Sequence, residues 1–579
     1  MDTIRMKING FEFPVRADAT ILEASREAYG AKQWDIYIPT LQYLKGVQEE
    51  DNSGICVVTV KGVDGLVNPS TTKVEEGMEV FTRSEDAMGA KIGAYMQIMA
   101  AHDQNCRECF RTGNCELQAI ANHLWLGAGP VTDKNRIWPV DKSGIIVRDE
   151  NKCVKCGRCV AVCSNLQGIG AIEMIDNRVI PAGGAEKLSD TKCVSCGQCI
   201  AACPVGALRE RDDVDKVLDA IADPEKYVVI QTAPSLRAGI GEAFGFPVGS
   251  GAEGKMVAAL KEVGFDKVFD TVFSADLTIM EEANEFVTRL KNGGVLPMTT
   301  SCCPAWIKFC EQEYPDLLNH VSSCKSPQQM FGAIAKSYLA EKLNISKDKI
   351  VVVSAMPCTA KKFELTRDDE AGAGVPDVDF SLTAREVASL IKRCEIKFSA
   401  LADAEFDTFM GEGTGAGLIF GVTGGVMEAA LRTAADWLSG EDLKEIEYRD
   451  IRGMKGVKEA IVKIAGKEIK VAVSHGLANA RKLMDSVRDG TVSYDFIEIM
   501  SCPGGCVNGG GQPQQVSDVH TAIDIRKTRG EVLYDLDEKS VIRKSHENSE
   551  IKTLYAEYLG EPGSDHARQL LHTTYKARG

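Results

Sequence analysis

The pattern of apolar and polar positions divides the chain into β-rich, helical and α/β stretches. Near the start, "IRMKING" and "FEFPVRA" alternate apolar and polar residues, which predicts a β-hairpin, and "TILEASREAYG" has the spacing of a helix. "ICVVTVKG" predicts a further strand. We therefore expect a small β-rich module over residues 1–82, followed by a helical stretch over residues 83–127.

From about residue 211 to the end, apolar strands alternate with amphipathic helices, which is typical of an α/β fold. Four of these strands lead into residues that could bind a ligand or take part in a reaction. "YVVIQTA" leads to Pro234 and Ser235, "GVLPMTTS" to Cys302 and Cys303, "KIVVVSAMP" to Cys358, and "YDFIEIMS" to Cys502. Ligands bind beyond the carboxyl ends of strands in open α/β sheets, so these motifs predict one shared cleft.

Composition and charge exclude some classes of partner. The chain has 579 residues, 44% of them hydrophobic and 26% charged, with a net charge of −16. A nucleic-acid partner is not expected, because its binding requires a basic face. No apolar run is long enough to cross a membrane, and the first residues lack a signal-peptide core, so we expect no membrane partner and a cytoplasmic protein.

The 20 cysteines change this ordinary picture. In a reducing compartment, clustered cysteines indicate metal ligation. Within residues 128–210, "CVKCGRCVAVC" and "CVSCGQCIAACP" have the spacing of bacterial two-cluster ferredoxins, in which the fourth cysteine of each run serves the other cluster. Two structural zinc sites are the alternative, which the doubled spacing and the final Cys-Pro disfavour. The two predicted [4Fe–4S] ligand sets are Cys153, Cys156, Cys159 and Cys203, and Cys163, Cys193, Cys196 and Cys199.

A third set of ligands occurs in "HDQNCRECFRTGNC", within the helical stretch. Taken alone, it suits zinc or an iron–sulfur cluster. Beside two ferredoxin-type clusters, a third [4Fe–4S] cluster is favoured, with ligands His102, Cys106, Cys109 and Cys115. The isolated cysteines are expected to pack as small buried apolar residues: Cys310, Cys324 and Cys394.

Three cleft motifs, "TTSCCPAW", "MPCTAKKFE" and "EIMSCPGGCVNGGGQP", resemble the three signatures of the [FeFe]-hydrogenases in their large clostridial-type form. The similarity also covers the cysteine runs and segments such as "SSCKSPQQMFGA" and "RKSHEN". It implies a multidomain α/β protein with four units. These are a β-grasp, plant-ferredoxin-like module (1–82), a histidine/cysteine-ligated module (83–127), a two-[4Fe–4S] ferredoxin-like domain (128–210) and a two-lobed H-cluster domain (211–579).

The resemblance implies an H-cluster, in which a [4Fe–4S] cube is joined through Cys506 to a diiron unit with CO, cyanide and a bridging azadithiolate. Thiolates suit this ligation, and the implied cube ligands are Cys303, Cys358, Cys502 and Cys506. Lys361 and Ser235 would donate to the two cyanides. The implied lining residues are Pro234, Gln328, Met356 and Met500. Without the resemblance, Lys361 would be a solvated lysine and the methionines ordinary core residues.

Neighbouring side chains on an extended chain point to opposite sides, so Cys302 and Cys303 are expected to differ in role. The resemblance implies that Cys302 is the proton-transfer thiol beside the diiron unit. It also implies a proton path to the surface through Cys302, Glu282, Ser322, Glu285 and Arg289. Glu282, Glu285 and Arg289 share one helix face, which alone would indicate only a solvated ion-pair face.

The N-terminal module departs from the family pattern. Gln42, Ser53 and Ser70 stand where the plant-type [2Fe–2S] cysteines are expected, and only Cys56 remains. We therefore predict that the fold is retained and the [2Fe–2S] cluster is absent. An unusual mixed-ligand site is the alternative. The third cleft motif also has Pro503 where some relatives have histidine.

The predicted function is that of an iron hydrogenase, which interconverts protons, electrons and H₂, with electrons relayed by three accessory [4Fe–4S] clusters. No convincing nucleotide or flavin motif is present. The expected partners are therefore ferredoxin, or flavin- and NAD(P)-binding subunits of an electron-bifurcating complex, besides maturation proteins for the diiron unit. A non-catalytic hydrogen sensor or iron–sulfur scaffold is the main alternative, disfavoured by Cys302, Lys361 and Cys506. The cleft motifs exclude a purely NADH-dehydrogenase-like electron-transfer subunit.

Overall fold

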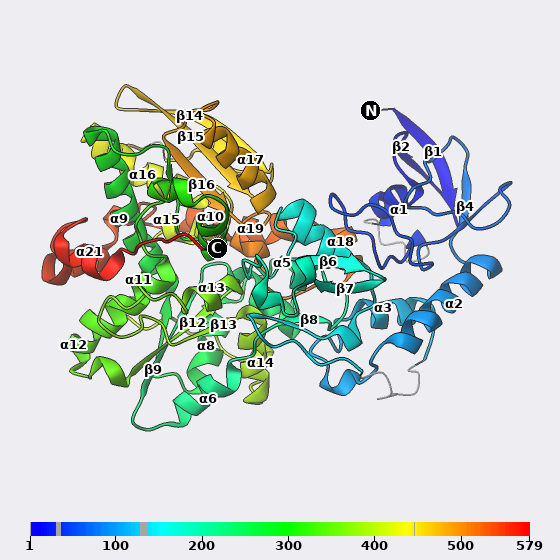
Figure 1. The fold of residues 1–579 in the computed structure, drawn as a ribbon, viewed down its shortest axis with the longest axis horizontal. Helices are drawn as coiled ribbons and strands as arrows, with labels where there is room; N and C mark the ends of the chain where they lie inside the picture. The colour runs from blue at the N-terminus through cyan, green and yellow to red at the C-terminus, as the bar shows by residue number, and fades with distance from the viewer. Residues whose placement is uncertain (1, 30–35, 128–136, 445, 579) are drawn as a thin grey trace.

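The computed structural model describes residues 2–29, 36–127, 137–444 and 446–578. The N-terminal modules lie at one side of the molecule and the large α/β region at the other, with the two cysteine runs between them (Figure 1). The predicted start of the third unit, at residue 128, lies outside the described residues.

The N-terminal module is a four-stranded mixed sheet, in the order β2-β1-β4-β3, covered by one helix. The predicted hairpin is present, and β1 also pairs in parallel with β4, as in a β-grasp fold. The strand expected in "ICVVTVKG" is much shorter than predicted, because the preceding residues form turns. The elements are β1 (Thr3–Ile8), β2 (Phe11–Arg16), α1 (Ile21–Tyr29), β3 (Thr59–Val60) and β4 (Glu79–Phe81).

The next two units pack together around the cysteines. Helix α2 (Glu85–Ala101) begins where the Ser84 side chain accepts a hydrogen bond from the Ala87 amide. The cysteine runs form two similar halves, since α4 and α5 each begin after a glycine with positive φ, Gly157 and Gly197. The other elements are α3 (Glu116–His123), β5 (Ile146–Arg148), α4 (Arg158–Ala161), β6 (Ile172–Ile175), β7 (Arg178–Pro181), α5 (Gln198–Ala202) and β8 (Leu208–Glu210).

The α/β region has two lobes, each built on a four-stranded sheet (Figure 1). One is parallel, in the order β10-β9-β12-β13, and the other has the order β11-β16-β15-β14 with one antiparallel pair. Strand β12 is buried along its whole length, as expected when helices cover both faces of a parallel sheet. The strands are β9 (Tyr227–Thr232), β10 (Lys267–Asp270), β11 (Met298–Thr299), β12 (Ile350–Met356), β13 (Phe380–Thr383), β14 (Val457–Ile464), β15 (Lys467–His475) and β16 (Phe496–Met500).

The longest helix, α9 (Thr271–Asn292), crosses the α/β region as a buried element. The Asp270 side chain caps its first turn and Gly293, in the left-handed conformation, ends it. Fifteen of its residues are buried, including Glu281 and Glu282, which is unusual for carboxylates. The helices around it include α10 (Pro304–Glu313), α11 (Pro327–Ile334), α13 (Ala360–Glu364), α14 (Ala384–Arg393), α16 (Gly425–Ser439), α17 (Leu477–Arg488), α19 (Ile525–Lys539) and α21 (Asp565–Leu571).

The glycine-rich loop after β16 joins the two-lobed region to the ferredoxin-like domain by direct backbone approach. A Cβ atom added to Gly510 would lie 2.3 Å from the Cys196 carbonyl oxygen. Hydrogen bonds secure the same junction, from Gln198 Nε2 to the Asn508 carbonyl (3.0 Å) and from Thr359 Oγ1 to the Ser195 carbonyl (2.6 Å). The spacing between the two domains is therefore fixed by the close backbone approach at Gly510 together with these two hydrogen bonds.

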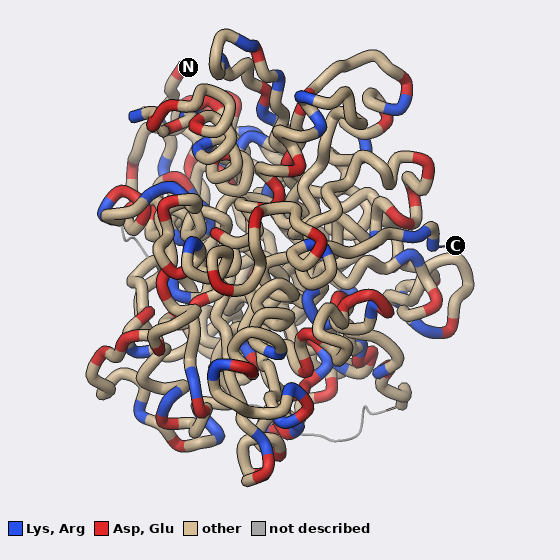
Figure 2. Tube along the Cα trace, turned by 90° about the vertical axis from the view of Figure 1, so that its left-hand side faces the viewer, with Lys and Arg blue, Asp and Glu red and all other residues tan. Residues whose placement is uncertain are grey.

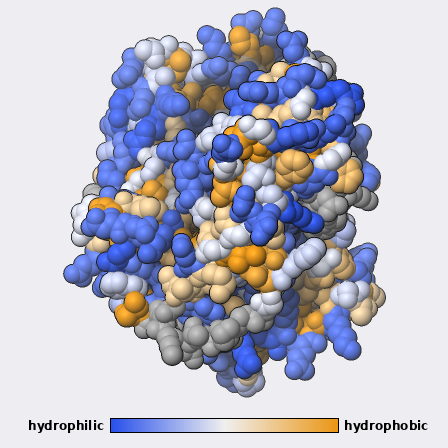
Figure 3. Space-filling model, turned by 90° about the vertical axis from the view of Figure 1, so that its right-hand side faces the viewer, coloured by the Kyte–Doolittle hydropathy of each residue, from blue (hydrophilic) through white to orange (hydrophobic). Residues whose placement is uncertain are grey.

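Acidic and basic residues are intermixed along the drawn trace, without a gathered basic band on the side that Figure 2 shows. Over the described residues, no helix is both long and apolar enough to cross a membrane. Apolar surface is exposed between hydrophilic patches on the side of the N-terminal modules (Figure 3). In the helical module, the exposed large apolar side chains include Met96, Phe110 and Trp125.

We expect Gly510→Ala to destabilise the junction, because the new methyl group must displace the backbone of the ferredoxin-like domain. Overpacking of this kind costs about 1–3 kcal/mol, which in a chain of this size should lower the thermal midpoint by about 1–3 °C. The measurement is thermal unfolding of the purified enzyme. Gly93→Ala in α2 is the matched control, since a Cβ atom there meets nothing within 4 Å and its midpoint should not fall. Equal midpoints for Gly510→Ala and the parent would contradict this account.

Candidate active site

The carboxyl ends of β9, β11, β12 and β16 meet at one cavity of about 80 Å³. It is enclosed mainly by apolar and cysteine side chains, together with one lysine and one glutamine. The shared cleft expected from the strand ends is therefore present. The residues expected there all line it: Pro234, Ser235, Cys302, Cys303, Gln328, Met356, Cys358, Lys361, Met500, Cys502 and Cys506. Thr271, Ala275 and Phe420 also line it, and no sequence motif had indicated them.

Four of the lining thiols lie close enough together to affect one another electrostatically. Burial raises the pKa of Cys502 to about 11, and the charge of Cys303 adds to the shift. Burial also raises the pKa of Cys506 well above its usual value, followed by the effects of Cys502, Cys358 and Cys303. Without a metal, Cys502 and Cys506 are therefore protonated thiols, and a soft metal ion such as iron would stabilise their thiolate form.

Two further features fit a bulky inorganic group with acceptor ends in this cavity. The Ser235 hydroxyl is fully buried and has no hydrogen-bond partner, although it lies on the cavity wall. A Cβ atom at Gly505 would lie 2.6 Å from the Thr423 amide nitrogen, and one at Gly509 would lie 2.2 Å from the Pro357 carbonyl oxygen. The loop around Cys506 can therefore enclose the cavity only with glycine at these positions.

Lys361 is held by a buried carboxylate that sequence analysis did not single out. Its Nζ donates to Glu364 Oε2 at 2.9 Å and to the Cys302 carbonyl at 3.1 Å. Burial would lower the pKa of Lys361, but Glu364 outweighs it and the pKa is raised, so the ammonium stays charged. Glu364 also accepts from Gln328 Nε2 and Ser326 Oγ, each at 2.9 Å. The signal available in "KKFE" was the three-residue spacing of Lys361 and Glu364 on a helix.

Cys302 and Glu282 lie side by side in a dry interior. Burial raises the pKa of the Cys302 thiol well above its usual value, and Glu282 raises it further, so the thiol is protonated at neutral pH. Glu282 is itself fully buried, and neither carboxyl oxygen has a hydrogen-bond partner within bonding distance. Burial, followed by the charge of Glu285, raises the pKa of Glu282 to about 8. The carboxyl is therefore poised to exchange a proton near neutral pH.

The outer members of the predicted path are joined by hydrogen bonds. Ser322 Oγ donates to Glu285 Oε2 at 2.9 Å. Arg289 Nε donates to Glu285 Oε1 at 3.1 Å, and its Nη1 donates to the Asn319 carbonyl at 3.2 Å. Glu285 and Arg289 are only partly exposed, with side-chain exposures of 15% and 14%. The structure thus brings the five predicted path residues together between the cavity and the surface.

The structure brings the ferredoxin-type cysteines together in two groups. Burial raises the pKa of Cys159, with further increases from Cys156, Cys203 and Cys153. Burial likewise raises the pKa of Cys199, and smaller increases come from the nearby thiols of Cys196, Cys193, Cys163 and, from the first set, Cys159. A small cavity of about 20 Å³ lies within the first set. The two sets are therefore neighbours.

The helical module brings its three thiols together beside the first ferredoxin-type set. Burial raises the pKa of Cys115, and Cys109 adds to the shift. Burial also raises the pKa of Cys109, and Cys106 adds to it. His102 ends α2 as a buried residue, and burial together with the Lys152 charge lowers its pKa to about 4. Its imidazole is therefore neutral, which is the form that binds a metal.

A buried carboxylate organises the N-terminal module where a plant-type ferredoxin has its cluster loop. Asp51 Oδ2 accepts hydrogen bonds from the amides of Leu41, Gln42 and Tyr43 at 2.7, 2.8 and 3.2 Å. Ser53 Oγ donates to Asp51 Oδ1 at 2.5 Å, and the Asp51 amide donates to Ser70 Oγ at 3.0 Å. The loop's donors are therefore satisfied by protein oxygen. Sequence analysis missed Asp51.

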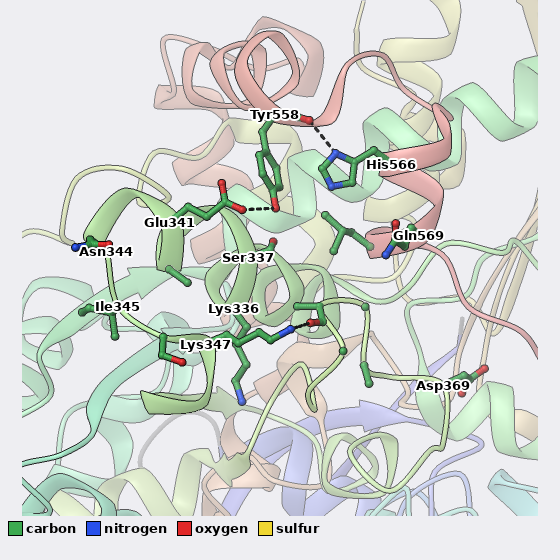
Figure 4. Close-up of a pocket in the computed structure, with 17 residues that line it drawn as sticks. Lys336, Ser337, Glu341, Asn344, Ile345, Lys347, Asp369, Tyr558, His566 and Gln569 are labelled. Atoms are coloured by element: carbon green, nitrogen blue, oxygen red, sulfur yellow. Dashed lines mark hydrogen bonds between the residues drawn. The ribbon is translucent and has the colours of Figure 1, made fainter.

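A larger open hollow of about 850 Å³ lies elsewhere in the α/β region, between the residues that follow α11 and the C-terminal helices (Figure 4). Lys336, Glu341 and His566 are among its lining residues, and no cysteine is. It is therefore separate from the metal chemistry. Of the isolated cysteines, Cys310 and Cys324 are fully buried as expected, whereas Cys394 is only half-buried.

Comparisons with known proteins agree with this arrangement. The family model for the iron only hydrogenase large subunit, C-terminal domain, matches residues 226–510, and that for the iron hydrogenase small subunit matches residues 523–578. A 4Fe-4S dicluster domain model matches residues 152–207. A 2Fe-2S iron-sulfur cluster binding domain model matches residues 1–85, although Gln42, Ser53 and Ser70 replace expected ligands.

Individual proteins extend the similarity over the whole chain. The "NADP-reducing hydrogenase subunit HndD" of Solidesulfovibrio fructosivorans is 44% identical, with complete coverage of both chains. "Iron hydrogenase 1" of Clostridium pasteurianum is 43% identical over 98% of this chain and 99% of its own. A solved structure of a variant of apo [FeFe]-hydrogenase HydA1 from Chlamydomonas reinhardtii has a TM-score of 0.57 and 42% identity, covering 64% of this chain and 100% of its own.

These matches define the protein first as a multidomain iron–sulfur oxidoreductase with a ferredoxin-like domain. The chain belongs to the iron-only, or [FeFe]-, hydrogenase family, and it is an enzyme that acts on hydrogen. The family and enzyme class predicted from the cleft motifs are thereby confirmed.

The raised pKa of Glu282 predicts a pH-dependent stability. The native state keeps this proton up to about pH 8, whereas the unfolded chain releases it above about pH 4.5, so the parent loses stability as pH rises between these values. Glu282→Gln does not titrate. We expect its thermal midpoint, relative to the parent, to increase from about pH 5 to about pH 8. Glu186→Gln, at an exposed position, is the control and should show a constant difference. A constant difference for Glu282→Gln as well would contradict the raised pKa.

Proposed function

We propose that this chain is the catalytic subunit of an iron hydrogenase that interconverts protons, electrons and H₂ at an H-cluster. The observation that carries the proposal is the convergence of Cys303, Cys358, Cys502 and Cys506 with Ser235 and Lys361 on one dry cavity, beside Cys302. When bound, the H-cluster supplies the metal chemistry of forming and cleaving H₂. The four cysteines would hold its cube. The Ser235 hydroxyl and the Lys361 ammonium would donate hydrogen bonds to its cyanide ligands.

The protein's own contribution near the diiron site is proton delivery. The Cys302 thiol is protonated and faces the cavity, and Glu282 behind it has a pKa near neutrality. Ser322, Glu285 and Arg289 continue the path outward. A carboxyl without hydrogen-bond partners can turn between the thiol and the serine hydroxyl at little cost, because no bond must be broken first. This supports Glu282 as the relay.

Electrons would reach the site through neighbouring thiol sets. Arg111 lies near both Cys115 and Cys203, which connects the helical module to the first ferredoxin-type set. Cys159 and Cys199 connect that set to the second. Cys196 lies near Cys502, so the second set adjoins the cube. We propose a [4Fe–4S] cluster in each of the three sets, which forms a continuous chain of carriers from the helical module to the cavity.

The electron partner would dock on the helical module, which exposes the apolar side chains of Met96, Phe110 and Trp125. The similarity to HndD, which is named as an NADP-reducing hydrogenase subunit, supports a complex with NAD(P)-binding subunits, beside which we propose flavin-binding ones. Ferredoxin is the second candidate electron partner. Maturation proteins would install the diiron unit.

Substituting the two adjacent cysteines separately tests the site. Cys302→Ala should leave the infrared bands of iron-bound CO and cyanide unchanged, while H₂ evolution from reduced viologen falls by at least ~100-fold, the usual effect of losing a positioned acid. Cys303→Ala should lose the bands as well, because it removes a ligand of the cube. Matured parent enzyme without these bands would refute the hydrogenase proposal. Normal turnover of Cys302→Ala would refute only the proton path.

Iron content tests the N-terminal module. If Asp51 replaces the cluster, the matured chain should hold about 18 iron atoms, twelve in accessory clusters and six in the H-cluster, instead of about 20. Electron paramagnetic resonance of the reduced enzyme should show no [2Fe–2S] signal. Cys56→Ala serves as the control and should leave the spectrum unchanged. A [2Fe–2S] signal that disappears in Cys56→Ala would establish the mixed-ligand alternative.

A further inference from the structure

Three metal-binding side chains outside the iron sites converge beside the proposed proton path. One ligand atom each from Glu285, Cys324 and His572 lies within 4.8 Å of the others. Cys324 is fully buried, whereas Glu285 and His572 have side-chain exposures of 15% and 10%. An ion can therefore reach the group from the surface side while sulfur closes the inner side. Sequence analysis had assigned Cys324 to simple packing.

The C-terminal segment fixes this geometry. Beyond α21, the chain returns to the middle of the molecule (Figure 1), where Cys324 and His572 form an antiparallel β-bridge. The Lys325 amide donates to the Leu571 carbonyl and the Thr573 amide to the Ser323 carbonyl, each at 2.8 Å. The cysteine and the histidine are thus held together by backbone pairing, although they lie 248 positions apart in sequence.

His572 also has the supporting contact that zinc-binding histidines generally have. Its Nε2 lies 3.0 Å from Glu281 Oε2, so a buried carboxylate accepts that ring proton. Glu281 is fixed in turn by the Tyr555 hydroxyl and the Gly563 amide. Nδ1 is therefore left with a lone pair, and it faces Ser323 Oγ at 2.8 Å, on the side of Glu285. A carboxylate behind a histidine orients the ring and makes it a better ligand.

We propose that Glu285, Cys324 and His572 form a binding site for Zn²⁺. A thiolate, an imidazole and a carboxylate are the three side-chain ligands that zinc takes in proteins, with one position left for water or Ser323. Mg²⁺ and Ca²⁺ prefer oxygen ligands only and should not compete. Because Glu285 is the outer carboxylate of the proposed proton path, bound zinc would occupy the carboxylate oxygens, which could then no longer accept protons, and turnover would stop. This second consequence rests on the proposed function, whereas the site itself does not.

The binding test uses matured enzyme with one equivalent of Zn²⁺ and zinc-edge X-ray absorption. We expect one sulfur neighbour at about 2.3 Å together with nitrogen and oxygen neighbours at about 2.0–2.2 Å. Cys324→Ala should lose the sulfur contribution, and His572→Gln should lower the amount of zinc retained after dialysis. Cys310→Ala, which removes another fully buried isolated cysteine, is the matched control and should bind as the parent does. Unchanged spectra and retention in the first two variants would overturn the site.

The inhibition test measures H₂ evolution against zinc concentration, with each variant compared to its own zinc-free rate. The concentration for half-inhibition should rise at least ~10-fold in Cys324→Ala and His572→Gln, as expected for the loss of one ligand or its support. Mg²⁺ should have no effect. Equal inhibition of the parent and the two variants would show that zinc does not inhibit H₂ evolution through this site. If zinc binds with the expected sulfur neighbour but does not inhibit, then neither the proposed inhibition nor the proton route through Glu285 holds. Failure of the proposed function itself is distinguished from this result by the absence of CO bands from the matured parent enzyme.

Discussion

Backbone-to-backbone contact at the glycine-rich loop is the constraint on which the active site depends. The loop after β16 carries two cysteines to the cavity, passes beneath Pro357 and touches the ferredoxin-like domain at Cys196. At Gly509 and Gly510 the space is too small for a Cβ atom, so the positions of the strand ends, the thiols and the neighbouring domain are set together. The proximity of Cys196 to Cys502 follows from this packing.

The active site also depends on how its buried charged residues are stabilised. Burial alone would lower the pKa of Lys361, but the charge of Glu364 raises it, and Glu364 itself accepts hydrogen bonds from Gln328 and Ser326. Glu282 has no such support, and its carboxyl is correspondingly easy to protonate. The two buried glutamates therefore differ in environment, since Glu364 accepts three close hydrogen bonds, whereas burial and the charge of Glu285 raise the pKa of Glu282. One stabilises a fixed positive charge, and the other can exchange protons.

Local motifs predicted the cysteine sets, the strand-end cleft and the helix face of Glu282 and Glu285, because ligand spacing and helical period are properties of short segments. Contacts between distant segments were not predictable in the same way. The C-terminal segment packs on Ser323 and Cys324 across about 250 positions, and no pattern in either segment indicates the other. The short β3 strand was mispredicted for a related reason. Asp51 draws the neighbouring residues into turns, and its role is visible only when the amides of Leu41, Gln42 and Tyr43 are seen to converge on it.

The Asp51 carboxylate has a consequence for biogenesis. In most iron–sulfur modules, folding is coupled to metal delivery, because the ligand loops have no satisfied conformation without the ion. Here the amides of the loop already have an acceptor within the chain. If the module holds no cluster, as proposed, it can therefore complete its fold without iron and present a folded surface before the downstream clusters are inserted.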